Sequence, residues 1–435
     1  MEENQKRVRE KYPLYRYSET AFKDVEATEY YRTRRYHPVN SGDTFDDGRY
    51  FVHQKLGYGS YATVWIAGDV KSTIKVKKAS ASTENIEDDL EIQRMKEVET
   101  SHAENFPNGP RYFVHLLNCL TVVGPNGSHS CLMMELLGPS LDNVLQAFEY
   151  NKQTLRPATI LRSSRQLLDA IDSAHQAGFF HGDISYSNVA FTCKTALWND
   201  DDAELFTTMM NNDSPHLVEH PIWPGWKENT CEEIRLIDWA DALPVGSAVT
   251  RLAQPRRMRA PESFSRDILD YRQDFWQAGC VIYALFFQVK PFSFRWSKGS
   301  TDLIQTQIKM LGPLPLAWHG NWEELRLENP IEPPYWNDDM PFSPSLLMTD
   351  NFEPRRRAII DASEANSASE DWYYETDEHT EHDYEGLKCL LDVMKGLFKF
   401  DLEIRMSASK AISVIDDAWI DHRKAMMQEM DKIED

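Results

Sequence analysis

The most informative segment of the sequence runs His181-Gly182-Asp183-Ile184-Ser185-Tyr186-Ser187-Asn188. In it a carboxylate, Asp183, and an amide, Asn188, stand five residues apart, and a second carboxylate, Asp238, ends a strand-like run further along the chain. Carboxylate and amide oxygens suit a hard cation such as Mg²⁺, and a carboxylate on a loop can orient a substrate hydroxyl. We therefore interpret Asp183 as a candidate catalytic residue, and Asn188 and Asp238 as candidate metal ligands.

A glycine-rich turn lies between two strand-like runs nearer the N-terminus. It spans Leu56-Gly57-Tyr58-Gly59-Ser60-Tyr61-Ala62-Thr63-Val64. Glycines let the backbone approach phosphate oxygens, and Val64 can pack on a nucleotide base. Taken alone, the segment is equally typical of an ordinary hairpin turn. A dinucleotide-binding fingerprint is disfavoured because Ala62 takes the place of the third glycine and a strand follows instead of a helix.

Two charged residues beyond this turn complete the pattern. Lys75 lies in the next strand-like run, and Lys77 on the same face is the alternative candidate. Glu91 follows on a helix that the apolar spacing predicts within residues 83–99. A lone strand lysine is usually just an exposed charge, whereas a Lys–Glu pair orders the lysine for phosphate binding.

The composition of all 435 residues indicates a globular protein, with 41% apolar and 11% aromatic residues. No apolar run reaches the roughly 18 residues of a membrane span, and the N-terminus is polar, so we expect no membrane partner and an intracellular protein, cytoplasmic or nuclear. The six scattered cysteines are interpreted as buried thiols. A net charge of −22 disfavours direct nucleic-acid binding and would attract basic partners, although solubility is the simpler explanation.

The chain divides by pattern into an extension and two larger parts. Residues 1–45 are mostly polar, and we interpret them as an N-terminal extension draped over a domain. Short strand-like runs and one helix fill 46–137, and helical periodicity dominates 138–425. Loop-like or acidic segments near 194–232 and 319–386 are interpreted as surface insertions. The expected fold is α+β with two lobes, an antiparallel sheet of about five strands and a mainly helical lobe.

In order and spacing these segments resemble the eukaryotic protein-kinase family, over roughly residues 43–420. A further family motif is Arg259-Ala260-Pro261-Glu262, whose glutamate we expect to pair with Arg405. Finer features are similar to the SR-protein-specific branch of Ser/Thr kinases; they include Tyr36-His37-Pro38-Val39, Gly48-Arg49-Tyr50, Glu135-Leu136-Leu137-Gly138 and Leu311-Gly312-Pro313-Leu314-Pro315. The resemblance implies transfer of the γ-phosphoryl group of ATP to Ser or Thr hydroxyls, and it points to Arg/Ser-rich proteins as substrates.

The resemblance also implies a role for each candidate residue. Asp183 would accept or orient the substrate hydroxyl, and Asn188 and Asp238 would bind Mg²⁺. Lys75, held by Glu91, would grip the α- and β-phosphates. The other nucleotide contacts would come from the glycine-rich turn, a gatekeeper methionine and the two backbone positions after it: Leu56, Gly57, Gly59, Val64, Met134, Glu135 and Leu137. Phosphoryl transfer needs little covalent help from protein, so positioning and charge neutralisation must supply most of the rate.

Three positions depart from the family's pattern at the reacting centre. Gly182 stands where the family has an arginine, so an activation-loop phosphate would lack that partner. Ser185 replaces the lysine that neutralises the γ-phosphate, and Pro255 replaces a threonine that bonds to this lysine. Losing such a charged donor can cost about 10²–10³ in rate. Arg256 or Arg257 is a candidate source of the missing positive charge.

Two alternatives to a protein kinase stay open. The changes at Ser185 and Pro255 suit a nucleotide-binding pseudokinase that acts as a scaffold. A small-molecule phosphotransferase also fits His-Gly-Asp followed by Asn, because aminoglycoside- and choline-kinase relatives commonly lack the loop lysine. Against this second alternative stand segments 259–262 and 274–276, which build a peptide-binding shelf in protein kinases.

Overall fold

The computed structural model describes residues 28–67, 72–151, 155–193, 232–247, 249, 254–264, 269–292, 300–328 and 386–418. The chain forms two compact units, which are described separately. The first, the sheet unit, comprises Met1–Ala147 and Ser187–Ala240; the second, the helical unit, comprises Phe148–Tyr186 and Asp241–Asp435. In the described residues no helix is both long and apolar enough to cross a bilayer.

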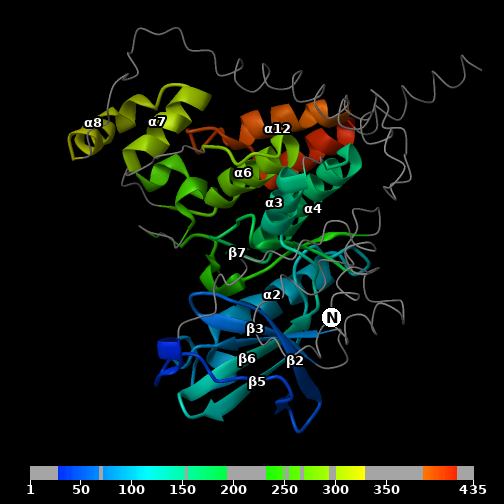
Figure 1. The fold of residues 1–435 in the computed structure, drawn as a ribbon. Helices are drawn as coiled ribbons and strands as arrows, with labels where there is room; N and C mark the ends of the chain where they lie inside the picture. The colour runs from blue at the N-terminus through cyan, green and yellow to red at the C-terminus, as the bar shows by residue number, and fades with distance from the viewer. Residues whose placement is uncertain are drawn as a thin grey trace, which may run out of the picture. The chain divides into compact units, whose positions relative to one another are not determined.

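Six antiparallel strands in the order β1-β2-β3-β4-β6-β5 form the sheet unit's main layer (Figure 1). In chain order they are β1 (Thr44–Phe45), β2 (Tyr50–Tyr58), β3 (Ala62–Ala67), β4 (Ser72–Lys77), β5 (Leu116–Gly124) and β6 (Gly127–Glu135). The β5–β6 hairpin turns at Gly127, whose φ of 129° is a conformation that favours glycine. The predicted β2–β3 hairpin and antiparallel sheet are therefore confirmed, with one short strand more than the five expected.

The helix predicted within residues 83–99 is α2 (Leu90–Asn105), which begins later than predicted. A 3₁₀ turn, η3 (Ile86–Asp88), comes first. The side chain of Asn85 accepts from the backbone N–H of Glu87, and these local bonds compete with a continuous helix. Asp89 then caps α2, because its carboxylate accepts from the backbone N–H of Glu91.

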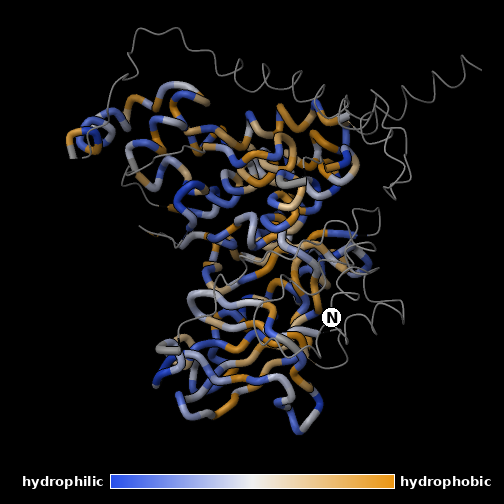
Figure 2. Tube along the Cα trace, viewed as in Figure 1, coloured by the Kyte–Doolittle hydropathy of each residue, from blue (hydrophilic) through white to orange (hydrophobic). Residues whose placement is uncertain are grey.

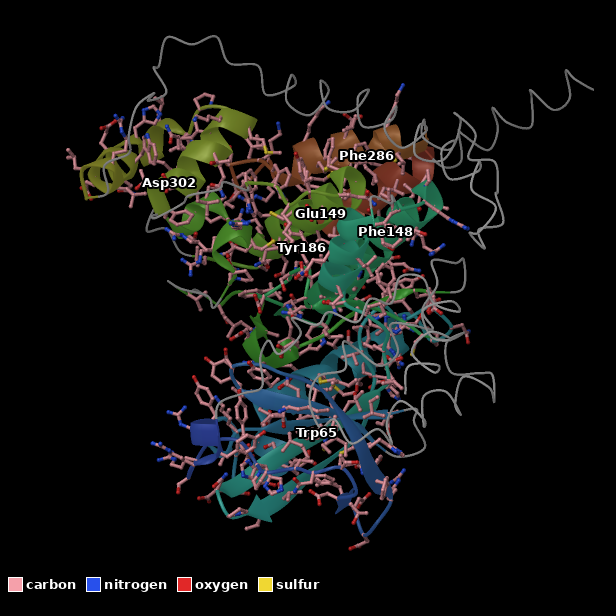
Figure 3. The ribbon with its side chains drawn as sticks, in the orientation of Figure 1. Trp65, Phe148, Glu149, Tyr186, Phe286 and Asp302 are labelled. Atoms are coloured by element: carbon pink, nitrogen blue, oxygen red, sulfur yellow. The ribbon has the colours of Figure 1, made fainter. Side chains whose placement is uncertain are left out.

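The interpretation of residues 1–45 as an arm draped over a domain is wrong for the described residues that precede β2. Tyr36, Val39 and Phe45 are buried, with at most 7% of each residue exposed. Val39 and Phe45 belong to the same apolar cluster as Trp65 of β3, which is labelled in Figure 3. Mostly polar residues separate these three in the chain, so the sequence showed no apolar pattern there. Residues 1–27 lie outside the described part.

A second, two-stranded sheet belongs to the sheet unit. β8 (Val189–Phe191) pairs antiparallel with β9 (Ile234–Leu236), and all six residues are buried. A 3₁₀ turn, η5 (Trp239–Asp241), follows β9. The candidate metal ligands Asn188 and Asp238 flank these strands. The predicted insertion near 194–232 lies outside the described residues except for Glu232.

The helical unit is organised around α6 (Gln273–Phe287), in which every residue except Tyr283 is buried. It packs against α4 and α12 (Figure 1), and hydrophobic residues are dense along this group in Figure 2. A short hairpin of β7 (Phe179–Phe180) and β10 (Leu243–Pro244) also belongs here. The other helices are α3 (Leu141–Asn151), within which the chain passes from one unit to the other, α4 (Pro157–Gln176), α7 (Ser300–Leu311), α8 (His319–Glu328), α12 (Cys389–Leu397) and a last helix over 408–418.

Within the predicted insertion near 319–386, residues 319–328 form the helix α8 and are not a loop. The prolines that suggested a loop stand outside this stretch, and an Arg326–Glu323 ion pair of 2.9 Å links neighbouring turns. The acidic remainder of that predicted insertion, up to residue 385, lies outside the described residues. The five described cysteines are free thiols, as predicted, but only Cys131, Cys193 and Cys280 are buried, whereas Cys119 and Cys389 are partly exposed.

Candidate functional site

Lys75 joins two carboxylates in the sheet unit. Its Nζ donates to Glu91 Oε1 at 2.6 Å and to Asp238 Oδ1 at 2.7 Å. The side chains of Lys75 and Glu91 are 12% and 2% exposed, whereas that of Asp238 is 45% exposed. Three residues from a strand, a helix and the end of another strand thus converge, although 163 positions separate Lys75 from Asp238. The structure therefore brings together the predicted lysine, helix glutamate and one predicted metal ligand.

The charge of Lys75 is set by opposing effects. Burial by itself lowers its pKa, but the negative charges of Glu91 and Asp238 and their hydrogen bonds more than offset burial. The pKa of Lys75 is therefore raised above its ordinary value. The amine stays protonated throughout the neutral range, which is the state that a phosphate-binding lysine needs.

Lys77, the alternative candidate, has different partners. Its Nζ donates to both carboxylate oxygens of Asp89 at 2.8 Å. It also lies 3.5 Å from Glu91 Oε2. Lys75 is accordingly the lysine placed between Glu91 and Asp238; the pairing with Glu91 agrees with the prediction, and the bond to Asp238 was not predicted.

The backbone around Asp238 is held by α2. Asp238 has a φ of 67°, a left-handed conformation that is uncommon for a non-glycine residue and is frequent at functional sites. Arg94, one helical turn after Glu91, donates to the backbone oxygen of Ala240 at 2.6 Å. Trp239, between Asp238 and Ala240 in the chain, is 1% exposed and lies edge-on to Phe113, with ring centroids 6.2 Å apart. One helix therefore positions both Glu91 and the segment that carries Asp238.

Asn188 is placed beside the same segment by strand pairing. The backbone N–H of Ile237 donates to the backbone oxygen of Asn188 at 2.9 Å, and Val189 pairs with Leu236. This register puts Asn188 and Asp238 at the same end of the β8–β9 hairpin. The two predicted metal ligands are hence neighbours within one unit, and both offer oxygen atoms.

The predicted nucleotide contacts also fall in the sheet unit. Gly57 pairs with Val64 across β2 and β3, and Leu56 precedes the pair. A Cβ on Gly57 or Gly59 would meet no protein atom within 4 Å, so both positions have open space beside the backbone. The hydroxyl of Tyr36 donates to the backbone oxygen of Gly59 and ties the turn to the preceding segment.

The gatekeeper segment ends β6. Met134 pairs with Thr73 across β4 and β6, and Thr73 Oγ1 donates to its backbone oxygen at 3.5 Å. Glu135 accepts the backbone N–H of His115 at 2.8 Å through Oε1, which fixes the strand end. Leu137, two residues later, is half-buried.

Asp183 belongs to the helical unit, where buried side chains hold its loop. The carboxylate of Asp274 accepts the backbone N–H groups of His181 at 2.7 Å and Gly182 at 2.9 Å. Gln277 Oε1 accepts that of Ile184 at 3.0 Å. The backbone on both sides of Asp183 is therefore fixed from α6, and Gly182 adopts a φ of 78° that glycine permits.

The departures from the family pattern fall in the same unit. Ser185 is buried, with 5% of the residue exposed, and Pro255 is exposed at the start of a 3₁₀ turn. Just before it, Gln254 Nε2 donates to the backbone oxygen of Gly182 at 2.9 Å and to Gln273 Oε1 at 2.7 Å. A neutral glutamine thus joins the segment before Pro255 to the loop that carries Asp183, called the catalytic loop below. That Arg256 or Arg257 supplies the missing positive charge stays a prediction.

The predicted Glu262–Arg405 pair is confirmed. Arg405 donates through both terminal nitrogens, at 2.7 and 2.8 Å, to the two oxygens of Glu262. The side chains are 1% exposed or less. This two-bond pair joins segments 143 residues apart within the helical unit.

Sequence reasoning missed several residues that shape the site. Arg94 could have been found from its position three residues after Glu91, since residues i and i+3 share a helix face. Asp274 was noted only as part of a peptide-binding segment, although its main contacts are with the catalytic loop. Gln254 and Gln277 gave no signal, because glutamine is common on surfaces and its burial depends on tertiary packing.

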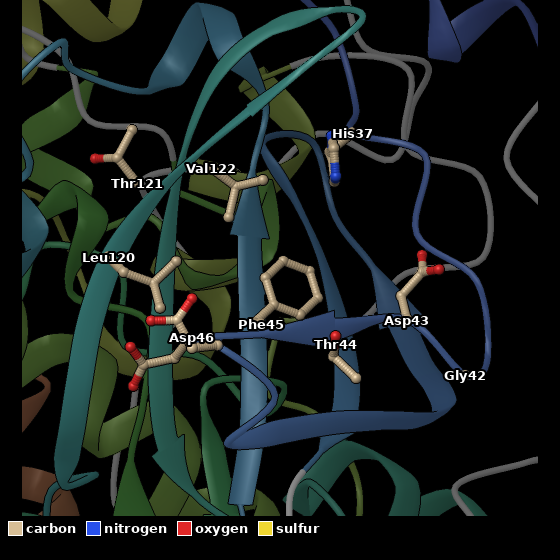
Figure 4. Close-up of a pocket in the computed structure, with 10 residues that line it drawn as sticks. His37, Gly42, Asp43, Thr44, Phe45, Asp46, Leu120, Thr121 and Val122 are labelled. Atoms are coloured by element: carbon tan, nitrogen blue, oxygen red, sulfur yellow. The ribbon is translucent and has the colours of Figure 1, made fainter.

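A cavity of about 660 Å³ lies elsewhere on the sheet unit. Figure 4 shows Phe45, Leu120 and Val122 along it, with Asp43 and Asp46 also lining it. None of the predicted nucleotide or metal residues lines this cavity. It is therefore separate from the site assembled around Lys75.

Comparison with known proteins relates the chain to kinases. Protein kinase dsk1 of Schizosaccharomyces pombe is 32% identical over 171 residues, which cover 38% of this chain and 30% of the relative. SRSF protein kinase 3 of Homo sapiens is 35% identical over 162 residues, 35% of this chain and 27% of the relative. A serine/threonine protein kinase of Aspergillus fumigatus is 25% identical over 392 residues, 88% of this chain and 87% of the relative.

The first two matches span less than a third of each relative's length. The name of SRSF protein kinase 3 agrees with the predicted resemblance to the SR-protein-kinase branch, which is confirmed. The protein kinase domain, as a family, matches residues 50–419. With that match covering most of its length and the predicted α+β class confirmed, the chain belongs to the protein kinase domain family.

Proposed function

We propose that this chain is a protein kinase that transfers the γ-phosphoryl group of ATP to Ser or Thr hydroxyls of Arg/Ser-rich proteins, with Mg²⁺ as its metal. One observation carries the proposal: Lys75 is bonded to both Glu91 and Asp238. A decayed site would have little reason to retain a buried lysine with two carboxylates converging on it, since such charges are costly unless they are paired and used.

The donor set fits the proposed metal. Asn188 and Asp238 supply oxygen atoms from the same end of one hairpin, and oxygen is the ligand type that Mg²⁺ prefers. The side chain of Asp238 is 45% exposed and so is accessible to an ion. When bound, Mg²⁺ neutralises the charge that develops on the phosphate oxygens.

The chain's own residues would bind and orient the nucleotide. The Lys75 amine, kept protonated and held by Glu91, would contact the α- and β-phosphates. The backbone at Gly57 and Gly59 has open space beside it for close approach of phosphate oxygens. Leu56, Val64, Met134, Glu135 and Leu137 would surround the adenine, as the family resemblance implies.

Asp183 would orient the attacking hydroxyl and receive its proton. Its contribution depends on position, and the bonds from Asp274 and Gln277 to the neighbouring backbone fix the loop. A misplacement of about 1 Å can cost roughly 10²-fold in rate. Ser185 supplies no positive charge, so we expect a slower reaction than a catalytic-loop lysine would allow.

The decisive experiment is a phosphotransfer assay with radiolabelled Mg·ATP and an Arg/Ser peptide, with an Arg/Ala peptide as the matched control. We expect label on the Arg/Ser peptide alone. Asp183→Ala should lower kcat by about 10²–10⁴-fold, the usual contribution of a general base, while ATP affinity is kept. Isothermal titration of ATP measures that affinity separately.

The other outcomes separate the alternatives. ATP binding without transfer to any peptide would indicate the scaffold. ATP turnover that needs no peptide would indicate a small-molecule phosphotransferase. Transfer that persists in Asp183→Ala would contradict the assigned base.

A further inference from the structure

Lys77 is a second buried lysine of β4, and the proposed nucleotide site makes no use of it. It stands two residues after Lys75, so both side chains leave the same face of the strand. Its side chain is only 9% exposed. A lysine this buried is rarely kept without carboxylate partners, and Lys77 has two of them, Asp89 and Glu91.

Asp89 links this lysine to the start of α2. Its side chain is 2% exposed, and both its oxygens accept from Lys77 Nζ at 2.8 Å. Oδ1 also accepts the backbone N–H of Glu91 at 3.1 Å, which makes Asp89 the N-cap of the helix. The residue that caps α2 is therefore attached directly to β4.

Glu91 lies between the two lysines. Its Oε1 accepts from Lys75 at 2.6 Å, and its Oε2 lies 3.5 Å from Lys77 Nζ. The geometry points to Lys77 and Asp89 as positioning residues: they hold the first turn of α2 against β4, so that Glu91 presents Oε1 to Lys75. This inference rests on the proposed nucleotide-binding role of Lys75.

A stabilising role alone does not explain the pair. Buried ion pairs add little net stability compared with apolar residues of the same size, and in some proteins they instead specify how the elements they join are arranged. Here the joined elements are the strand of Lys75 and the helix of Glu91. The orientation of Lys75 toward phosphate would follow from that arrangement.

The test compares Lys77→Met with two control variants on α2. Lys77→Met leaves the carboxylates of Asp89 and Glu91 without their shared cation, so the helix start should move. Val98→Ala removes volume from a fully buried position of the same helix and lowers stability without touching the pair. Lys96→Met removes an exposed lysine whose ion pair with Glu87 is on the surface.

We expect Lys77→Met to lower kcat by about 10²-fold and to weaken Mg·ATP affinity, with the peptide KM unchanged. Asp89→Asn, which keeps a capping oxygen but loses the charge, should give a smaller loss. Val98→Ala and Lys96→Met should keep wild-type kcat in an assay run well below each variant's melting temperature.

Three results would overturn the inference. They are wild-type kcat and ATP affinity in Lys77→Met, a change in peptide KM alone, or an equal kcat loss in Val98→Ala at a matched fall in melting temperature.

If the wild-type protein binds ATP but phosphorylates no peptide, the proposed function fails, and the ATP affinities of the variants then test this inference. Weaker binding by Lys77→Met than by Val98→Ala would still support it, and equal binding would contradict it. A wild-type protein that binds no ATP contradicts both.

Discussion

At the scale of single residues, Lys55 shows how surroundings set a side chain's charge. Its Nζ lies over the rings of Trp65 and Tyr58, 5.4 and 5.5 Å from their centroids. Burial lowers its pKa from 10.5 to about 8. The folded protein thus releases this proton at a lower pH than the unfolded chain. Between about pH 8 and 10.5 the unfolded state binds more protons, so this group makes stability rise with pH.

Lys55→Gln should remove that rise. Urea midpoints of wild type and variant, measured from pH 7 to 9.5, are expected to differ most at pH 7, where the wild type carries the buried charge, and to approach each other above pH 8. Lys96→Met is the matched surface control and should leave the wild-type pH profile in place. Parallel curves for wild type and Lys55→Gln would show that Lys55 titrates normally.

Residues with an intrinsic chemical signal could be predicted from the sequence, and residues that act only through packing could not. Lys75, Glu91 and Asp238 were found because charge within strand and helix patterns is unusual, and the structure brings them together. Lys77 was noticed, but its partner Asp89 was not, because the predicted helix range 83–99 placed Asp89 among many other charged residues. Gln277 acts on the catalytic loop only once α6 is buried.

At the scale of elements, α2 serves the site twice, through Glu91 and through Arg94. Arg94 donates to the backbone oxygens of Trp239 at 3.5 Å and Ala240 at 2.6 Å, which restrains the segment after Asp238. Arg94→Met should release this segment and lower both kcat and Mg·ATP affinity by about tenfold or more, as expected when a buried charged hydrogen bond worth about 1.5–3 kcal/mol is lost.

Titration of Mg·ATP and the emission maximum of Trp fluorescence, to which the buried Trp239 contributes, would measure the two effects of Arg94→Met. Glu97→Gln changes an exposed residue of the same helix and is expected to alter neither. Unchanged ATP affinity in Arg94→Met would mean that β9 alone fixes Asp238.

Elements with strong periodicity were predictable, and their ends were not. The β2–β3 hairpin, α4 and α6 follow from alternation or from long apolar runs. The start of α2 was misjudged because it depends on side-chain caps, and α8 was not recognised as a helix because its charged sequence has no long apolar stripe. The buried residues before β2 were missed because their burial depends on contacts with β3 and β5, distant in sequence.

At the scale of the whole molecule, the two units are each held by contacts between distant parts of the chain. Lys75 and Asp238 are 163 positions apart, and Glu262 and Arg405 are 143 apart. Such pairs cannot be read from local pattern: the Glu262–Arg405 pair was predicted, whereas the Lys75–Asp238 pair was not. The chain's net charge, by contrast, is available from the sequence and has a consequence that needs no knowledge of any single contact.

That consequence concerns basic substrates. A net charge of −22 produces an attractive field for an Arg-rich peptide, and salt screens it, because the Debye length falls from about 10 Å at 0.1 M to about 3 Å at 1 M. If the proposed substrates are correct, KM for an Arg/Ser peptide should rise steeply between 0.05 and 0.5 M salt, by roughly tenfold or more, while kcat changes little. A peptide with the same serines but neutral neighbours should show a flat KM over this range. If both peptides respond alike, the acidic surface serves solubility, and substrate choice must come from contacts at the site itself.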